Sequence, residues 1–190
     1  MIKKLLLIIL FTQLSSCAVL HEEYFYPQAN GATIEKEYCR GKVGADNQLV
    51  YHFDNVKIKV MLWEYQGITR LGITFDISED ATIVWPIQIV DIYTDNRKRE
   101  LKADSFTRLR FVNRYESNDL LEKEYPVNSI MDRTTDETFE TYSQSFLIID
   151  KEISKLKIDT IKVIINGKDY FLSNIIFTKK SGVFLHPLNC

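Results

Sequence analysis

The sequence predicts an all-β protein, built as an immunoglobulin-like antiparallel β-sandwich, with an antiparallel β-barrel as the alternative. Apolar and polar residues alternate with a period of two through most of the chain, the spacing at which side chains leave opposite faces of a sheet. Turn-forming residues separate these segments at short intervals. No stretch rich in proline, glycine or serine divides the chain, so its 190 residues predict one main domain.

The clearest strand covers residues 56–62, where aliphatic residues at every second position alternate with lysine and methionine. Residues 71–77 alternate in the same way. Near the C-terminus, residues 161–165 alternate and are followed by Asn166-Gly167, a pair that accepts the two positive φ values of a type I′ turn. We therefore expect a hairpin in which residues 169–178 form the returning strand.

Shorter alternating segments predict the remaining strands, at residues 34–38, 48–53, 82–85, 88–93, 107–113 and 139–149. Helix is expected only twice. Ser117 can cap a short helix over residues 118–125 that Pro126 would end, and residues 151–155 would form one helical turn.

The composition excludes two classes of protein. Hydrophobic residues make up 45% of the chain and charged residues 26%, with only seven glycines and four prolines, which excludes a disordered chain. Lysine and arginine number 24 against 26 aspartates and glutamates, a net charge of −2. Because binding to nucleic-acid phosphates requires a basic surplus, we expect no nucleic-acid partner.

The N-terminus has the order of a signal peptide. Lys3 and Lys4 precede an apolar run at residues 5–11. As a helix, such a run would extend about 10–15 Å, and the hydrocarbon core of a bilayer is roughly 30 Å thick. The run therefore predicts a signal peptide and not a transmembrane anchor.

Leu14-Ser15-Ser16-Cys17 follows the apolar run, with an aliphatic residue, two small residues and a cysteine. This segment resembles the lipobox of bacterial lipoproteins. The resemblance implies that residues 1–16 are a signal peptide and that Cys17 is lipidated and becomes the first residue. Acyl chains on Cys17 would hold the protein on a membrane surface without spanning it. The alternative is an ordinary secretory signal that is cleaved nearby and leaves Cys17 free or disulfide-bonded.

The lipobox resemblance also implies a location. In Gram-negative lipoproteins an aspartate after the modified cysteine favours the inner membrane, and this chain has Ala18 there. We therefore expect the protein in the cell envelope, anchored at the periplasmic face of the outer membrane. Residues 17–32 show no sustained periodicity and predict a lipidated tether, and residues 33–190 predict the domain. The aromatic residues at 24–26 would dock on the domain or lie among lipid headgroups.

The body of the chain resembles a group of Gram-negative envelope lipoproteins to which no activity is assigned. Four features carry the resemblance: Tyr-Phe-Tyr-Pro at 24–27, Tyr-Cys-Arg-Gly at 38–41, the strand at 56–62 and the Asn166-Gly167 hairpin. None of them is a catalytic signature. The resemblance thus implies an envelope lipoprotein but no particular chemistry.

No residue pattern points to catalysis, a metal or a cofactor. The three histidines, at positions 21, 52 and 186, are not spaced to present two metal ligands from one element. The chain lacks the Gly-x-Ser-x-Gly nucleophile motif. The acidic residues Asp132, Asp136 and Glu137 lack the spacing of an EF-hand loop. We therefore expect a binding protein that is not an enzyme and has neither metal nor cofactor.

Two surface features are candidates for contact with a partner. The outward face of the strand at 56–62 continues into Met61, Trp63 and Tyr65, which predict an aromatic patch for a protein partner. The alternative is a strand end covered by a loop or by the tether. The basic turn Arg97-Lys98-Arg99, together with Lys102, is either a solvated hairpin tip or a contact for anionic lipid headgroups.

The cysteine count predicts one disulfide. If lipid occupies Cys17, then Cys39 and Cys190 are the two thiols that remain in an oxidising compartment. A bond between them would close a loop around most of the domain, worth about 5 kcal/mol in the chain-entropy model. The alternatives are a free Cys190 in a disordered tail and an intermolecular bridge.

These expectations together predict a lipid-anchored binding or accessory module of the cell envelope, which holds a protein or a surface polymer through a sheet face or loop tips. The alternative is an immunity lipoprotein that neutralises a toxin delivered to the periplasm. A small acidic β-domain near a membrane would suit that role. Nothing in the composition separates the two functions.

Overall fold

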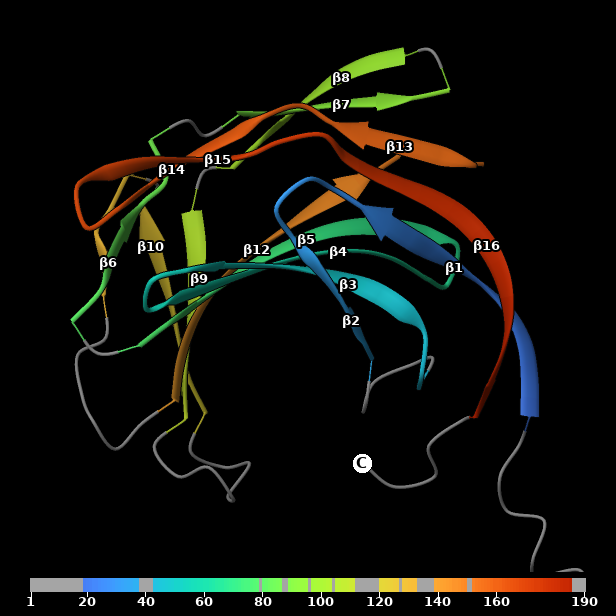
Figure 1. Cartoon of the computed structure of the whole chain (residues 1–190), viewed down its shortest axis with the longest axis horizontal. Helices are drawn as coiled ribbons and strands as arrows, with labels where there is room; N and C mark the ends of the chain where they lie inside the picture. The colour runs from blue at the N-terminus through green and yellow to red at the C-terminus, as the bar shows by residue number, and fades with distance from the viewer. Residues whose placement is uncertain are drawn as a thin grey trace, which may run out of the picture.

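Strands form all the regular secondary structure described by the computed structural model (Figure 1). The described residues are 19–37, 43–78, 80–86, 89–95, 97–103, 105–111, 120–126, 128–132, 139–149 and 152–185. In this part of the chain, no helix has the length and hydropathy needed to cross a membrane.

Sheet A contains five strands in the order β1-β16-β13-β7-β8, and all neighbours pair antiparallel. Its edge strands are β1 and β8. The strands are β1 (Val19–Gln28), β16 (Ile175–Leu185), β13 (Lys155–Ile158), β7 (Ile89–Thr94) and β8 (Arg97–Lys102).

Sheet B contains seven antiparallel strands in the order β10-β9-β12-β5-β4-β3-β2. Its centre is made of the long strands β12, β5 and β4. The strands are β10 (Leu120–Pro126), β9 (Ser105–Phe111), β12 (Phe139–Ile148), β5 (Ile68–Ile77), β4 (Val56–Tyr65), β3 (Asp46–Phe53) and β2 (Thr33–Lys36).

Sheet C contains four antiparallel strands in the order β11-β6-β14-β15. They are β11 (Met131–Asp132), β6 (Thr82–Val84), β14 (Ile161–Ile165) and β15 (Lys168–Leu172). Figure 1 shows β7, β8, β13, β14 and β15 on one side of β3, β4 and β5. The sheets are not closed into a barrel. The all-β prediction is confirmed, and the open antiparallel sheets are compatible with the predicted sandwich.

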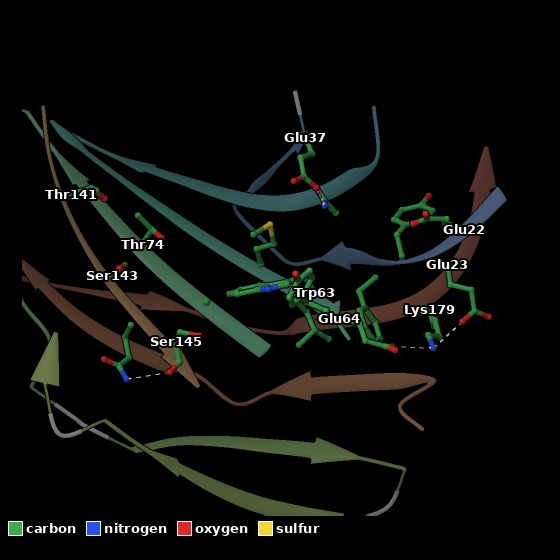
Figure 2. A pocket seen from close by; sticks show the side chains of 18 residues that line it. Glu22, Glu23, Glu37, Trp63, Glu64, Thr74, Thr141, Ser143, Ser145 and Lys179 are labelled. Carbon is green, nitrogen blue, oxygen red and sulfur yellow. Dashed lines mark hydrogen bonds and ion pairs between the residues drawn. The ribbon is translucent and has the colours of Figure 1, made fainter. Parts of the chain in front are cut away.

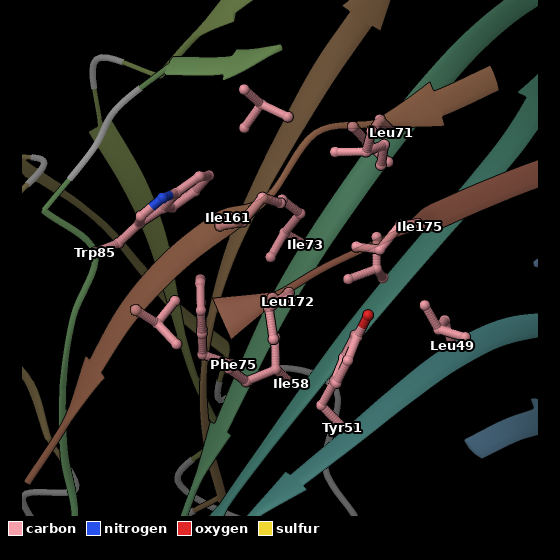
Figure 3. Close-up of a cluster of buried hydrophobic side chains, with 14 of the residues drawn as sticks. Leu49, Tyr51, Ile58, Leu71, Ile73, Phe75, Trp85, Ile161, Leu172 and Ile175 are labelled. Atoms are coloured by element: carbon pink, nitrogen blue, oxygen red, sulfur yellow. The ribbon is translucent and has the colours of Figure 1, made fainter. Parts of the chain in front are cut away.

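The hydrophobic core lies between sheet B and the other two sheets, where the alternating strands turn their apolar faces toward one another (Figure 3). In β4 and β5 every second residue is buried, as the sequence pattern predicted. Sheets A and C contribute buried residues such as Leu172, Ile175 and Phe177. At one end, the rings of Phe75, Trp85 and Phe106 pack with centroids 5.6–6.0 Å apart.

Tyr51 is the exception to apolar packing in this core. Its side chain is 1% exposed, and its hydroxyl has no hydrogen-bond partner in the described part of the chain. Burial raises the pKa of this phenol, which stays protonated. An unsatisfied buried hydroxyl costs about 1–3 kcal/mol, which the burial of the ring itself offsets.

The prediction of a tether at residues 17–32 is wrong for most of that segment. All ten residues of β1 pair with β16, from Val19 opposite Leu185 to Gln28 opposite Ile176. Phe25 is 2% exposed and belongs to the core, so the aromatic residues at 24–26 dock on the domain. The predicted domain boundary at residue 33 is therefore too late, because β1 is part of sheet A.

The helix predicted at residues 118–125 is also wrong, because residues 120–126 form β10 and pair with β9. The helical turn predicted at 151–155 is absent from residues 152–155, and β13 begins at Lys155. Residues 97–102 form the edge strand β8 and are not a hairpin tip. The predicted returning strand at 169–178 divides into β15 and β16 near Asn174, which has a φ of 55°.

The Asn166-Gly167 turn is confirmed, with φ values of 49° and 77° between β14 and β15. The signal peptide, the lipobox with Cys17, and the cysteines Cys39 and Cys190 lie outside the described residues. Their lipidation and disulfide stay predictions.

Phe25→Ala tests the place of β1 in the core. Removing a fully buried aromatic ring leaves a cavity, so we expect the free energy of unfolding to fall by about 3–5 kcal/mol in chemical denaturation. Tyr65, which is 64% exposed, provides the control: Tyr65→Ala should change stability by no more than about 0.5 kcal/mol. Equal stability of the two variants would contradict the placement of β1.

Candidate functional site: a groove on sheet B

The face of sheet B that points away from the core carries a groove of about 790 Å³. Side chains from β1, β3, β4, β5, β12 and β16, together with Glu37, line it (Figure 2). Its volume falls within the usual range for small-ligand pockets, about 300–1,000 Å³. The groove therefore has room for a small ligand or for a few residues of a partner chain.

Strand register explains why the sheet is hollow here. Met61 on β4 lies opposite Gly72 on β5, and Gly72 lies opposite Ser145 on β12. In the next row on this face, Thr74 lies opposite Ser143. Because β5 and β12 place small side chains in neighbouring rows, the longer side chains of β4 form a wall beside a shallow floor.

Trp63 lies across Gly72. A Cβ atom built on Gly72 would come within 2.7 Å of Cζ3 and 3.0 Å of Cη2 of the Trp63 indole. No real Cβ contact is that close, so the ring can take this position only because residue 72 is glycine. The half-buried indole thus forms part of the groove lining and does not enter the core.

The predicted patch of Met61, Trp63 and Tyr65 lies in this groove, since all three residues line it. Met61 and Trp63 are half-buried, and Tyr65 is 64% exposed at the end of β4. The structure therefore brings the three together on one surface. Whether that surface binds a partner stays a prediction.

Lys179 ties the two sheets together at one end of the groove. Its Nζ lies 2.9 Å from Glu23 Oε2 on β1 and 3.5 Å from Glu64 Oε2 on β4 (Figure 2). The hydrogen bond to Glu23, opposed by partial burial and supported by Glu64, raises the pKa of Lys179. The ammonium also lies 5.8 Å from the ring centroid of Phe25. This end of the groove is thus an ordered ion cluster.

Asn47 presents a buried acceptor in the lining. Its side-chain amide donates to Glu37 Oε2 at 2.5 Å, while its Oδ1 has no hydrogen-bond partner among the described residues. Asn47 is only 5% exposed. Because most buried polar atoms in proteins are satisfied, an acceptor of this kind beside a groove is suited to an N–H or O–H donor from a ligand.

Hydroxyl groups give the groove a polar side opposite its aromatic side. Thr74, Thr141, Ser143 and Ser145 line it from β5 and β12 (Figure 2). The Thr141 hydroxyl already donates a hydrogen bond to Asp76 Oδ1 at 2.9 Å. Aromatic anchors combined with a few polar groups are typical of binding sites, where apolar contact gives affinity and polar contact fixes orientation.

Among the described residues, no group of three His, Cys, Asp or Glu side chains is placed to hold a metal ion. His52 is exposed and its Nε2 lies 4.0 Å from Glu35 Oε1. Asp132 is in β11, where its carbonyl accepts a hydrogen bond from the Tyr142 hydroxyl. His186, Asp136 and Glu137 lie outside the described residues.

Several groove residues could not be found from the sequence. Gly72 is part of an alternating strand, and its use becomes visible only when the β4–β5 register places it beside Trp63. Glu23 and Lys179 are far apart in the chain and meet because β1 pairs with β16. The one signal available in the sequence was the aromatic end of β4.

Gly72→Ala tests the contact between Trp63 and the strand beneath it. The added methyl group would displace the indole, so we expect a large shift of the Trp63 side-chain N–H resonance in NMR spectra. The buried Trp85 indole in the same spectrum serves as an internal reference. Ser143→Ala, a change of similar size on the same face, should leave both resonances in place. An unmoved Trp63 signal in Gly72→Ala would show that the indole lies elsewhere.

No family model, no curated protein and no solved structure matches this chain.

Proposed function

We propose that this protein is a lipid-anchored binding module of the cell envelope, and that it holds a protein partner in the groove of sheet B. The observation that carries the proposal is the Trp63 indole seated on Gly72, which gives the groove a fixed aromatic surface. Tryptophan, tyrosine and methionine are enriched in the energetic centres of protein interfaces.

Polar groups surround the aromatic residues of the groove. Tyr65 is exposed beside Trp63, while the ion cluster at Lys179 and the hydroxyls of β5 and β12 form a polar rim. Asn47 Oδ1 is an acceptor to which a backbone N–H of the partner can donate. An aromatic centre inside a polar rim is the usual anatomy of a specific interface. Binding, and not catalysis, is the activity that this lining supports.

The anchor is supported by the lipobox and by the position of β1. Only Ala18 separates Cys17 from Val19, the first residue of β1. Two peptide units span at most about 7 Å, so lipid on Cys17 would hold the first residue of β1 at the bilayer surface. The domain would then sit directly on the membrane, in place of the long tether that the sequence predicted.

Cys17→Ser tests the anchor. Without the thiol no thioether to diacylglycerol can form, so we expect the acyl mass to disappear from the N-terminal peptide and the protein to leave the detergent phase. Mass spectrometry and detergent partitioning of protein from native membranes measure both effects. Cys39→Ser is the matched control and should remain lipidated. A wild-type protein without acyl mass on Cys17 would contradict the anchor.

A photo-crosslinking side chain at position 65 tests the groove in native membranes, with position 171 as the control. Phe171 is also an exposed aromatic, 56% accessible, but it lies on β15 of sheet C. We expect a defined adduct from position 65 and none from position 171. A secreted toxin as the adduct would favour the immunity alternative, and the same adduct from both positions would contradict a groove-specific partner.

Trp63→Ala should then weaken the complex by about 1–2 kcal/mol, because a truncated aromatic anchor loses contact area at the centre of an interface. The thermal midpoint should be nearly unchanged, since Trp63 lies outside the hydrophobic core. Titration calorimetry with the crosslinked partner and a thermal melt measure the two quantities, and Phe171→Ala serves as the control. A large loss of stability with unchanged affinity would show that Trp63 has a structural role only.

A further inference from the structure

The outer face of sheet A carries lysines and tyrosines that the groove does not use. Leu156, Ile158 and Phe177 point into the core, so the residues between them on β13 and β16 point away from it. We call the outward side chains of this sheet the lysine face. It comprises Lys98, Lys102, Lys155, Lys157 and Lys180, with Tyr26 and Tyr93 between them.

Strand register makes the lysine face continuous. Lys157 lies opposite Ile176 on one side and Tyr93 on the other, and Tyr93 lies opposite Lys98. In the next row, Lys155 lies opposite Thr178, which lies opposite Tyr26. The first row therefore runs from β8 to β16, and the second from β13 to β1, so the two rows overlap on β13 and β16. Figure 1 shows β8 and β1 at opposite ends of this sheet.

Two lysines on this face lie close to aromatic rings. Lys180 Nζ lies 3.5 Å from the ring centroid of Tyr26, and Lys157 Nζ lies 5.7 Å from that of Tyr93. Contact with a ring orients an ammonium group but leaves its positive charge in place. Lys98 is different, because it pairs with Asp91 Oδ2 at 2.8 Å. Lys155, Lys157 and Lys180 are exposed to solvent.

The sign of charge on this face differs from that of the whole chain. Across the five strands of sheet A, the outward positions that the structure describes hold the five lysines and three carboxylates, those of Glu22, Asp91 and Glu100. The complete chain has a net charge of −2. These outward positions thus have a positive surplus that the whole chain lacks, and an anionic surface would be attracted to it.

We propose that the lysine face docks the protein on an anionic phospholipid surface. Each lysine close to an anionic leaflet strengthens membrane binding by about fivefold, so several lysines on one plane act together. Tyrosine side chains are favoured at the headgroup level, where one end of the ring is apolar and the hydroxyl is wet. Tyr26 and Tyr93 supply such rings between the lysines.

The proposed lipid anchor belongs to the same sheet, and this step rests on the proposed function. Cys17 lies two residues before Val19, where the edge strand β1 begins. Lipid there would bring one edge of sheet A to the bilayer, and the lysine face would then hold the outer side of the sheet against the headgroups. The docking itself depends on charge and can be measured separately from lipidation.

The test uses the full chain reconstituted in vesicles of phosphatidylcholine, with or without phosphatidylglycerol. An amine-reactive reagent followed by peptide mass spectrometry gives the labelling rate of each lysine. We expect Lys155, Lys157 and Lys180 to label about fivefold more slowly on the anionic vesicles, and high salt to restore their rates. Lys36 on β2 and Lys168 on β15, both exposed, should label equally on both vesicles.

A matched pair of variants separates docking from a general effect of charge. Lys155→Glu with Lys157→Glu should abolish the protection of Lys180 on anionic vesicles. Lys36→Glu with Lys168→Glu changes the net charge by the same amount and should preserve it. Since all four lysines are exposed, thermal melts should show that both variants stay folded.

Three results would overturn the proposal: equal labelling on both kinds of vesicle, equal protection of Lys36 and Lys168, or protection that appears in native envelopes but not on vesicles. The last would assign the face to a protein or polymer. Loss of the lipid anchor can be measured separately from loss of docking. Cys17→Ser would abolish lipidation and leave the salt-dependent protection of Lys180 on anionic vesicles intact, so the two proposals fail independently.

Discussion

The pairing of β1 with β16 is the constraint on which the rest of the structure depends. It joins the first described strand of the chain to the last, along all ten residues of β1. The pairing buries Phe25 in the core and places Glu23 beside Lys179, which reaches Glu64 on β4. One end wall of the groove and one edge of the lysine face are both made from this ladder. A non-local ladder of this kind forms only after the chain between its strands has been brought together, which costs loop entropy.

In sheet B, the alternation of side chains along each strand supplies one face to the core and the other face to the groove. On β4 and β5 one set of alternate residues is apolar and buried, which leaves the other set free to vary without loss of core contacts. That second set holds Met61 and Trp63 on β4, and Gly72 on β5. A bulky residue at position 72 would strike the indole without touching the core. The groove can therefore change its shape and chemistry while the fold stays the same.

The sequence predicted the elements that strict alternation defines, such as β4, β5 and the β14–β15 hairpin. The sequence-based prediction failed for strands that are stabilised by pairing with segments distant in the chain. Residues 118–125 have the composition of a short capped helix, yet pairing with β9 makes residues 120–126 a strand, because a ladder of backbone hydrogen bonds outweighs the small differences in local propensity. β1 has mixed polarity on both faces, and the burial of Phe25 became visible only once its pairing with β16 was known. The sequence predicted the site residues that lie on a single strand, β4: Met61, Trp63 and Tyr65. It could not predict Gly72, Asn47 and Lys179, because these residues join the site only through the pairing of strands.

Two neighbouring residues of β16 show how the two proposed surfaces can act together. Lys179 lines the groove and holds Glu23 and Glu64, while Lys180 points the other way and contacts Tyr26 on the lysine face. Since successive side chains of a strand leave opposite faces, the two surfaces lie on opposite sides of this ladder. If the outer side of sheet A rests on headgroups, the groove of sheet B is therefore turned away from the bilayer and open to a partner in the aqueous space. Such an orientation lowers the entropy cost of binding, because the site is already held at one distance and angle from the membrane.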